Sequence, residues 1–134
     1  MKSFTLLLLM FLAFSPVRSQ NLVGFDAKSI KKYMKENYKN MMSEKVANPG
    51  FSYLKFSDNS DSQTLLFFLG SDSICKSERI MIDMRVKTDR VKEFNSIYRK
   101  HGELSWIDTR HGKDYLIELR DEPWYSVVTI MPHK

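Results

Sequence analysis

The chain has few of the residues that stabilise small domains covalently. Its 134 residues include one cysteine, Cys75, so an intramolecular disulfide is excluded. A lone cysteine is usually a small buried residue, and we expect Cys75 to lie in the core rather than to act as a reactive thiol. Stability must then come from packing, for which 43% hydrophobic and 13% aromatic residues are sufficient.

The sequence motifs of nucleotide and metal chemistry are also missing. The five glycines form no phosphate-binding loop, and there is no G-x-S-x-G or H-E-x-x-H sequence. His101, His111 and His133 lack the spacing of metal ligands. We therefore predict no catalytic residue, no cofactor and no metal site. A small hydrolase that uses His101 or His111 is the alternative from the enzyme class. A metal site would have to combine His101 and His111 with Glu103 or Asp108.

Long hydrophobic runs are absent except at the start of the chain. Residues 4–14 read FTLLLLMFLAF and follow Lys2, which is the pattern of a signal peptide. The run is too short to cross a hydrocarbon core of ~30 Å as a helix. We predict a signal peptide over 1–19, cleavage between Ser19 and Gln20, export to a periplasm or the extracellular space, and no transmembrane segment. An uncleaved anchor is the alternative.

Charge of one sign is in modest excess. The chain has 21 Lys and Arg residues against 16 Asp and Glu, and two of the cations leave with the signal peptide, so the mature excess is three. No basic stripe is interleaved with aromatic residues, so we predict that the protein does not bind nucleic acid. Five lysines of the first expected helix nevertheless share one face, which predicts contact with an anionic surface such as lipid headgroups, a glycan or an acidic protein. They are Lys28, Lys31, Lys32, Lys35 and Lys39. A solvated helix face is the alternative.

The order of the expected elements is helix, three strands, helix, three strands. Asp26 is positioned to cap the first helix, whose apolar residues recur at helical spacing until Asn48-Pro49-Gly50 ends it. The second helix is expected to begin at Thr88 or Asp89 and to end at Gly102. Six extended runs are expected at 51–56, 64–69, 74–84, 104–109, 115–120 and 124–131.

These elements predict an α+β fold over residues 20–134, built as a tandem αβββ-αβββ arrangement with halves of about 25–86 and 88–132. The two helices would pack on one antiparallel sheet or on two smaller sheets. Similar positions of FSYLKF and LSWIDT in the two halves suggest an internal duplication. Two short helices cannot cover both faces of a six-stranded sheet, so a patch containing Trp106, Tyr115 or Trp124 would be left for a partner.

Several segments carry a resemblance to known families. The opening LVGFDAKSIKKYM and the hairpin TLLFFLGSDSICKSERIMID resemble the helix entry and paired strands of the SmpA/OmlA outer-membrane assembly lipoproteins. The tandem arrangement is similar to the β-lactamase-inhibitor-protein fold. The signal ending in Ser-Gln, the YLKF and TLLFF strands and the WYSVVTIM end resemble small exported proteins of Bacteroidota. The chain lacks the cysteine to which the SmpA/OmlA lipid is attached, and the resemblance supplies no catalytic residue.

One short stretch contains four potentially reactive polar residues around a glycine. Asp108, Arg110, His111 and Lys113 surround Gly112 between two expected strands, which predicts the solvated tip of a hairpin. We therefore predict an exported, non-enzymatic binding protein or envelope-interaction protein. Its partner would be another envelope protein or an anionic surface. A structural homodimer that pairs strand edges or sheet faces is a further alternative.

Overall fold

The computed structural model of the chain describes residues 21–48, 51–58 and 63–134, with the side chains of 45–48 and 51 left out. The expected signal peptide and the Ser19–Gln20 cleavage site therefore lie outside the described residues. Among the described residues, no helix is both long enough and apolar enough to cross a membrane.

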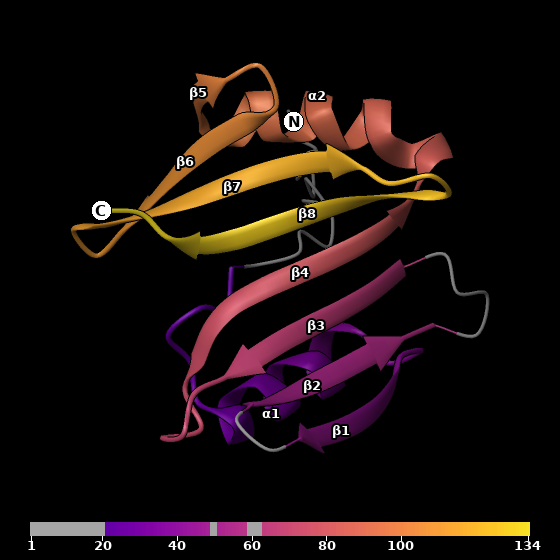
Figure 1. The fold of residues 1–134 in the computed structure, drawn as a ribbon, viewed down its shortest axis with the longest axis vertical. Helices are drawn as coiled ribbons and strands as arrows, with labels where there is room; N and C mark the ends of the chain where they lie inside the picture. Colours follow the sequence, from indigo (N-terminus) through magenta and orange to yellow (C-terminus); the bar gives the residue numbers. More distant parts are fainter. Residues whose placement is uncertain (1–20, 49–50, 59–62) are drawn as a thin grey trace, which may run out of the picture.

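The chain forms a helix followed by four strands, and then repeats this order (Figure 1). A single turn of 3₁₀-helix, Met84–Val86, precedes the second helix. The elements are α1 (Ala27–Asn37), β1 (Met42–Asn48), β2 (Phe51–Ser57), β3 (Gln63–Leu69), β4 (Cys75–Asp83), α2 (Lys87–Ile97), β5 (Arg99–Gly102), β6 (Ser105–Arg110), β7 (Lys113–Asp121) and β8 (Tyr125–Pro132).

All eight strands belong to one antiparallel sheet in the order β1-β2-β3-β4-β8-β7-β6-β5. The first four strands and the last four meet at the centre, where Glu78–Asp83 of β4 pair with Tyr125–Ile130 of β8. The predicted tandem αβββ-αβββ fold of balanced α+β composition is therefore wrong. The described chain is mostly β-sheet, carries only two short helices, and has one strand more in each half than the sequence analysis expected.

Both additional strands occupy segments that were expected to be helical. The first helix does not continue to Asn48, because Tyr38 leaves the helical conformation and its N–H makes the last α-type bond, to the carbonyl of Met34 at 2.8 Å. The chain then turns and pairs as β1 with β2. The second helix ends at Ile97, since Tyr98 is already extended, and Arg99–Gly102 pair with β6.

Local signals at the two helix starts had different outcomes. Asp26 caps α1 as predicted, and its Oδ1 accepts a hydrogen bond from the Ser29 N–H at 2.7 Å. The expected caps of α2 are wrong, because α2 begins at Lys87, after Val86, and Asp89 lies within its first turn. A carboxylate in that turn still favours the helix through its dipole.

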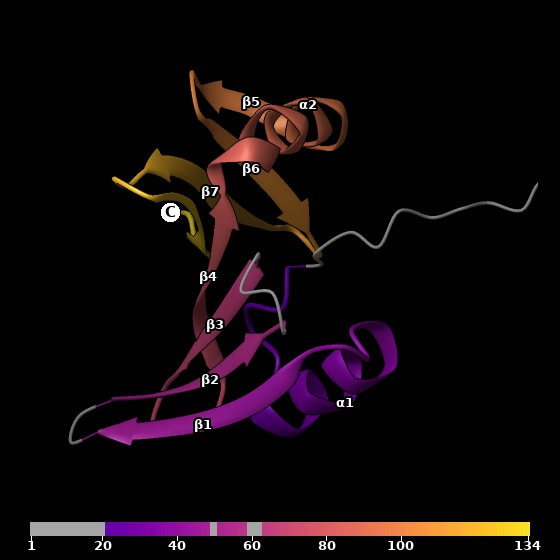
Figure 2. The same cartoon turned by 90° about the vertical axis from the view of Figure 1, so that its right-hand side faces the viewer.

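The core lies between the sheet and the two helices, which cover the same face of the sheet (Figure 2). Ile30 and Met34 are the buried residues of α1, and Phe94 is the buried residue of α2. The Phe94 ring packs edge-on against Trp106 with centroids 5.1 Å apart, and the Trp106 indole N–H donates to Asn95 Oδ1 at 2.9 Å. Cys75 is buried, as the sequence analysis expected.

The two tryptophans of the chain should therefore behave in opposite ways. Trp106 is 0% exposed and Trp124 is 87% exposed. We expect Trp106→Ala to lower the free energy of unfolding by about 3–5 kcal/mol, because it leaves a cavity in the core. We expect Trp124→Ala to change it by less than about 0.5 kcal/mol. Urea denaturation followed by circular dichroism measures both.

Acrylamide quenching in the single-tryptophan variants Trp124→Phe and Trp106→Phe provides an independent check. Fluorescence should be protected when only Trp106 remains and strongly quenched when only Trp124 remains. Equal quenching of the two variants would contradict the packing of the second half.

Candidate functional site

The segment that precedes α1 is buried, although it lies next to the expected signal peptide. Asn21, Leu22 and Val23 are each at most 2% exposed. The Gly24 N–H donates to the Cys75 carbonyl, and the Cys75 N–H donates to the Phe25 carbonyl, both at 2.8 Å. This N-terminal segment, residues 21–25, is therefore fixed to the start of β4.

Two ionisable side chains hold the N-terminal segment from opposite halves of the sheet. Glu78 of β4 accepts a hydrogen bond from the Leu22 N–H at its Oε2, at 3.2 Å. Arg110 of β6 donates to the Asn21 carbonyl and, at 3.0 Å, to the Val23 carbonyl. The Asn21 side chain in turn donates to Asp108 Oδ2 at 3.2 Å. We call Asn21, Glu78, Asp108 and Arg110 the buried polar cluster.

Glu78 is the most perturbed acid of the described chain. It is 0% exposed, and burial raises the pKa of its carboxyl to about 8, against the smaller lowering effects of the Leu22 N–H and of the Arg110 charge. Its Oε1 has no hydrogen-bond partner among the described residues. The carboxyl is therefore mostly neutral at pH 7, and in this conformation no substrate could reach it.

The structure separates the four polar residues that the sequence placed together at a hairpin tip. His111 and Gly112 form that tip, with φ of 50° and 74°, and both are exposed. Asp108 and Arg110 do not belong to a solvated tip, because their side chains turn toward the core and bind Asn21. The Arg110 guanidinium also lies 4.9 Å from the centroid of the Tyr115 ring. The expectation of a purely polar turn was thus wrong for this pair.

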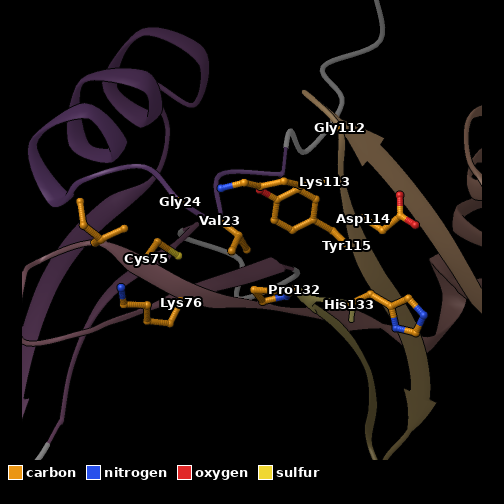
Figure 3. Close-up of a pocket in the computed structure, with 11 residues that line it drawn as sticks. Val23, Gly24, Cys75, Lys76, Gly112, Lys113, Asp114, Tyr115, Pro132 and His133 are labelled. Atoms are coloured by element: carbon orange, nitrogen blue, oxygen red, sulfur yellow. The ribbon is translucent and has the colours of Figure 1, made fainter.

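A pocket of about 560 Å³ lies beside the N-terminal segment, between the β6–β7 turn, the start of β4 and the C-terminal end (Figure 3). Val23 and Tyr115 contribute apolar surface, and Lys76, Lys113 and His133 contribute polar groups. Lys76 is paired with Asp72 at 3.0 Å, outside the pocket lining. The pocket has the size of a small-molecule site.

The one cysteine that lines this pocket is not an activated nucleophile. Cys75 lines it, but burial, reinforced by the nearby Glu78 charge, raises the pKa of its thiol to about 12. The thiolate is the nucleophilic form, so Cys75 is a poor nucleophile at neutral pH. The Asp114 carboxylate is held by the Thr109 hydroxyl at 2.6 Å and lies 3.7 Å from Arg99.

Two of the three histidines lie together in the structure. The rings of His101 and His133 pack against each other, with centroids 5.3 Å apart, whereas His111 lies at the hairpin tip. Asp108, which was a candidate for a metal site with His101 and His111, is bound to Asn21. Within the described ranges, no three His, Cys, Asp or Glu side chains are grouped so that they could hold a metal ion.

The predicted shared helix face holds for four of the five lysines, because Lys39 lies beyond the end of α1 at Asn37. We call all five, including Lys39, the α1 lysines. Lys28, Lys31, Lys32, Lys35 and Lys39 are all exposed, and none forms an ion pair within the part of the chain that the structure describes. Six cations elsewhere are paired with carboxylates. These are Lys76, Arg85, Lys87, Arg90, Arg99 and Arg120. The α1 lysines therefore make no close ion pair with a described carboxylate, although Asp26 interacts electrostatically with Lys28 and Glu36 lies on the same helix.

A second pocket, of about 550 Å³, opens between α1 and the adjacent strands β1 and β2. We call it the α1 groove. Three of the α1 lysines line it, and the apolar part of the lining is Met34, Met41 and Phe56. Sequence reasoning found the lysines but not the groove, because Met41 and Phe56 reach it only through the pairing of β1 with β2.

The aromatic residues expected at a partner surface are in different environments. Trp106 and Tyr115 belong to the core, so neither forms an exposed aromatic patch for a partner, although Tyr115 lines the 560 Å³ pocket. Trp124 is exposed in the turn between β7 and β8. On the opposite face of the sheet, half-buried Tyr53 and Phe68 pack against each other with ring centroids 5.5 Å apart.

Glu78 was missed by sequence reasoning, although a signal for it exists. Ile80 and Ile82 point into the core, and a strand repeats its faces every two residues. Extending that period back along β4 places Glu78 on the same buried face. A lone acid at an apolar position of a central strand could therefore have been recognised as a buried carboxyl.

Comparisons with protein-family models, with curated proteins and with solved structures found no match to this chain. The resemblance to SmpA/OmlA, to the β-lactamase-inhibitor-protein fold and to exported Bacteroidota proteins remains a prediction. Inferences about function therefore depend on the geometry described above.

The buried Glu78 carboxyl should make stability depend on pH. In the unfolded chain its pKa is near the ordinary 4.5, and in the folded chain it is about 8. Its contribution to stability is therefore fully present below about 4.5, declines as the pH rises, and is lost above about 8. One pKa unit corresponds to about 1.4 kcal/mol, so we expect a decrease of a few kcal/mol.

Glu78→Gln is the matched variant, because an amide has the shape of a protonated carboxyl and cannot ionise. Urea denaturation between pH 5 and 9 should show a smaller fall in stability for the variant, which should be the more stable protein at pH 9. Parallel pH profiles for the two proteins would mean that Glu78 does not ionise as described.

The Cys75 thiol should be unreactive until the chain unfolds, because it is 1% exposed and its pKa is about 12. Ellman's reagent at pH 8 should label the native protein slowly and the urea-unfolded protein at once. Fast labelling of the native protein would show that the start of β4 opens readily.

Proposed function

We propose that this chain is an exported, non-enzymatic binding protein that attaches to an anionic membrane surface through the lysine-bearing face of α1. The observation that carries the proposal is a set of five exposed lysines, four on α1 and Lys39 directly after it, which form no ion pair among the described residues. Export is proposed from the N-terminal hydrophobic run, and a membrane is one of the anionic surfaces available to an exported protein.

The physical basis of attachment is electrostatic. A lysine close to an anionic bilayer contributes about 1 kcal/mol, and the attraction decays within a Debye length of about 10 Å at 0.1 M salt. Five unpaired lysines on one surface would give useful affinity at low salt. Cations already paired with carboxylates, such as Lys76 with Asp72, add little because their charge is locally balanced.

The non-enzymatic part of the proposal is supported by the state of the two most unusual titratable groups. Glu78 has no exposed surface, and the Cys75 thiol has a pKa of about 12. Glu78 is thus inaccessible to a substrate, and Cys75 is protonated at neutral pH, so neither group is suited to catalysis. A general acid or base must come within hydrogen-bond reach of the substrate, and Glu78 does not in this conformation.

Vesicle co-sedimentation tests the proposal. The protein, purified after export from cells that express the full-length sequence, is mixed with vesicles of phosphatidylcholine alone or with added phosphatidylglycerol. We expect binding only to the anionic vesicles at about 0.05 M sodium chloride, and loss of binding at about 0.5 M. Replacing all five α1 lysines by glutamine should abolish it.

A control of similar chemistry removes lysines from other parts of the molecule. Lys113→Gln/Lys134→Gln changes two exposed lysines outside α1 and should leave vesicle binding nearly unchanged. Lys28→Gln/Lys32→Gln removes the same charge from α1 and should weaken it. If the two double variants weaken vesicle binding equally, binding depends on net charge alone and a specific role of α1 is refuted.

A further inference from the structure

The α1 groove combines apolar and cationic surface in a way that a flat lysine-rich helix face does not. Met34 and Phe56 are almost fully buried at 1% and 4% exposure, whereas Lys31, Lys35 and Lys39 are exposed. The part of the groove nearest the core is therefore apolar, and the mouth is cationic. With about 550 Å³, it has the volume of a site for a small molecule.

We propose that the α1 groove binds a single lipid molecule with an anionic headgroup, with its alkyl chain against Met34, Met41 and Phe56 and its headgroup at Lys31, Lys35 and Lys39. This inference rests on the proposed membrane role and makes it more specific. Membrane attachment would then involve a defined site with one bound lipid, in addition to the general electrostatic attraction.

The arrangement of charge favours a lipid over an acidic peptide or a glycan. Lys31 and Lys35 line the groove from α1 and Lys39 lines it from the turn after α1, so three cations lie at one mouth. A polyanionic chain would need such charge along its length, whereas one headgroup suffices for three adjacent cations. Met34 and Phe56 are almost fully buried and form the floor, so an alkyl chain would gain mainly by covering the half-buried Met41 and the methylene stems of the lysines.

The groove also depends on the tertiary structure. Met34 comes from α1, Met41 from the turn that follows it, and Phe56 from β2, which is paired with β1. Ser43 of β1 lies directly opposite Phe56 and is the small residue of the lining. A large side chain at position 43 would fill the groove without changing its charge.

Isothermal titration with dodecanoate, kept below its micellar concentration, tests the site directly. We expect one molecule bound per chain, and an affinity that falls roughly two- to fourfold for each methylene removed. Dodecanol and dodecyltrimethylammonium, which lack the anionic group, should bind at least tenfold more weakly. Dodecanoate that does not bind, or that binds with many molecules per chain, overturns the proposal.

Two variants separate the groove from the rest of the helix. Lys31→Gln/Lys35→Gln/Lys39→Gln should lower dodecanoate affinity by roughly tenfold or more, whereas Lys28→Gln/Lys32→Gln, on the same helix but outside the groove, should retain it within about threefold. Ser43→Trp should abolish dodecanoate binding with every lysine present. Thermal melts by circular dichroism confirm that each variant is folded.

The same variants in the vesicle assay distinguish failure of the site from failure of the membrane role. If vesicle binding falls in proportion to the lysines removed while dodecanoate does not bind, the lipid site is refuted and the surface attachment stands. If dodecanoate binds as expected but no α1 variant affects anionic vesicles, the attachment is refuted and the groove is a site for free amphiphiles. Dodecanoate binding that is equal in all variants refutes the groove.

Discussion

The hydrogen bonds that fix Asn21, Leu22 and Val23 across the helix-covered face tie the two halves of the sheet together. Glu78 and Cys75 hold this segment from β4, the last strand of the first half, and Arg110 holds it from β6 of the second half. A hydrogen bond to a charged group contributes about 1.5–3 kcal/mol, more than a neutral one, so the bonds from the Arg110 guanidinium are the strongest of these at pH 7, where Glu78 is mostly neutral. Since α1 begins at Ala27, directly after this segment, the position of α1 also depends on it.

This constraint has a chemical consequence. A carboxyl and a guanidinium, which in a cleft could take part in catalysis, are here turned to backbone groups of their own chain. Their desolvation is offset by these hydrogen bonds rather than by a ligand. Among the charged groups on the described surface, the α1 lysines stand out because they have no ion pair with a described carboxylate and lie beside the partly open α1 groove. The proposed function and the proposed lipid site depend on this surface and not on the Glu78 and Arg110 side chains.

The sequence located most of the sheet but not its extent. Apolar runs such as TLLFFL marked six strands within a few residues, because strands inside a sheet that is covered on one face are rich in hydrophobic residues. The two edge strands escaped detection. β1 and β5 have few apolar residues and no strong alternation, and their strand conformation comes from pairing with β2 and β6. The pattern of their side chains does not by itself indicate a strand. Among the candidate site residues, the α1 lysines were visible from helical periodicity, whereas the groove beside them was not.

By itself, the sequence determined the helix start at Asp26, the turn at His111-Gly112, the burial of Cys75 and the shared helix face of four of the five lysines. Each of these follows from a local rule about capping, turn geometry, polarity or helical period. Only the tertiary structure decided that one sheet of eight strands joins the halves, that Trp106 belongs to the core, and that Asp108 and Arg110 face inward. It also placed Glu78 beside Leu22, 56 residues away along the chain. Such contacts depend on strand order and on where the N-terminal segment lies, and no short stretch of sequence encodes either.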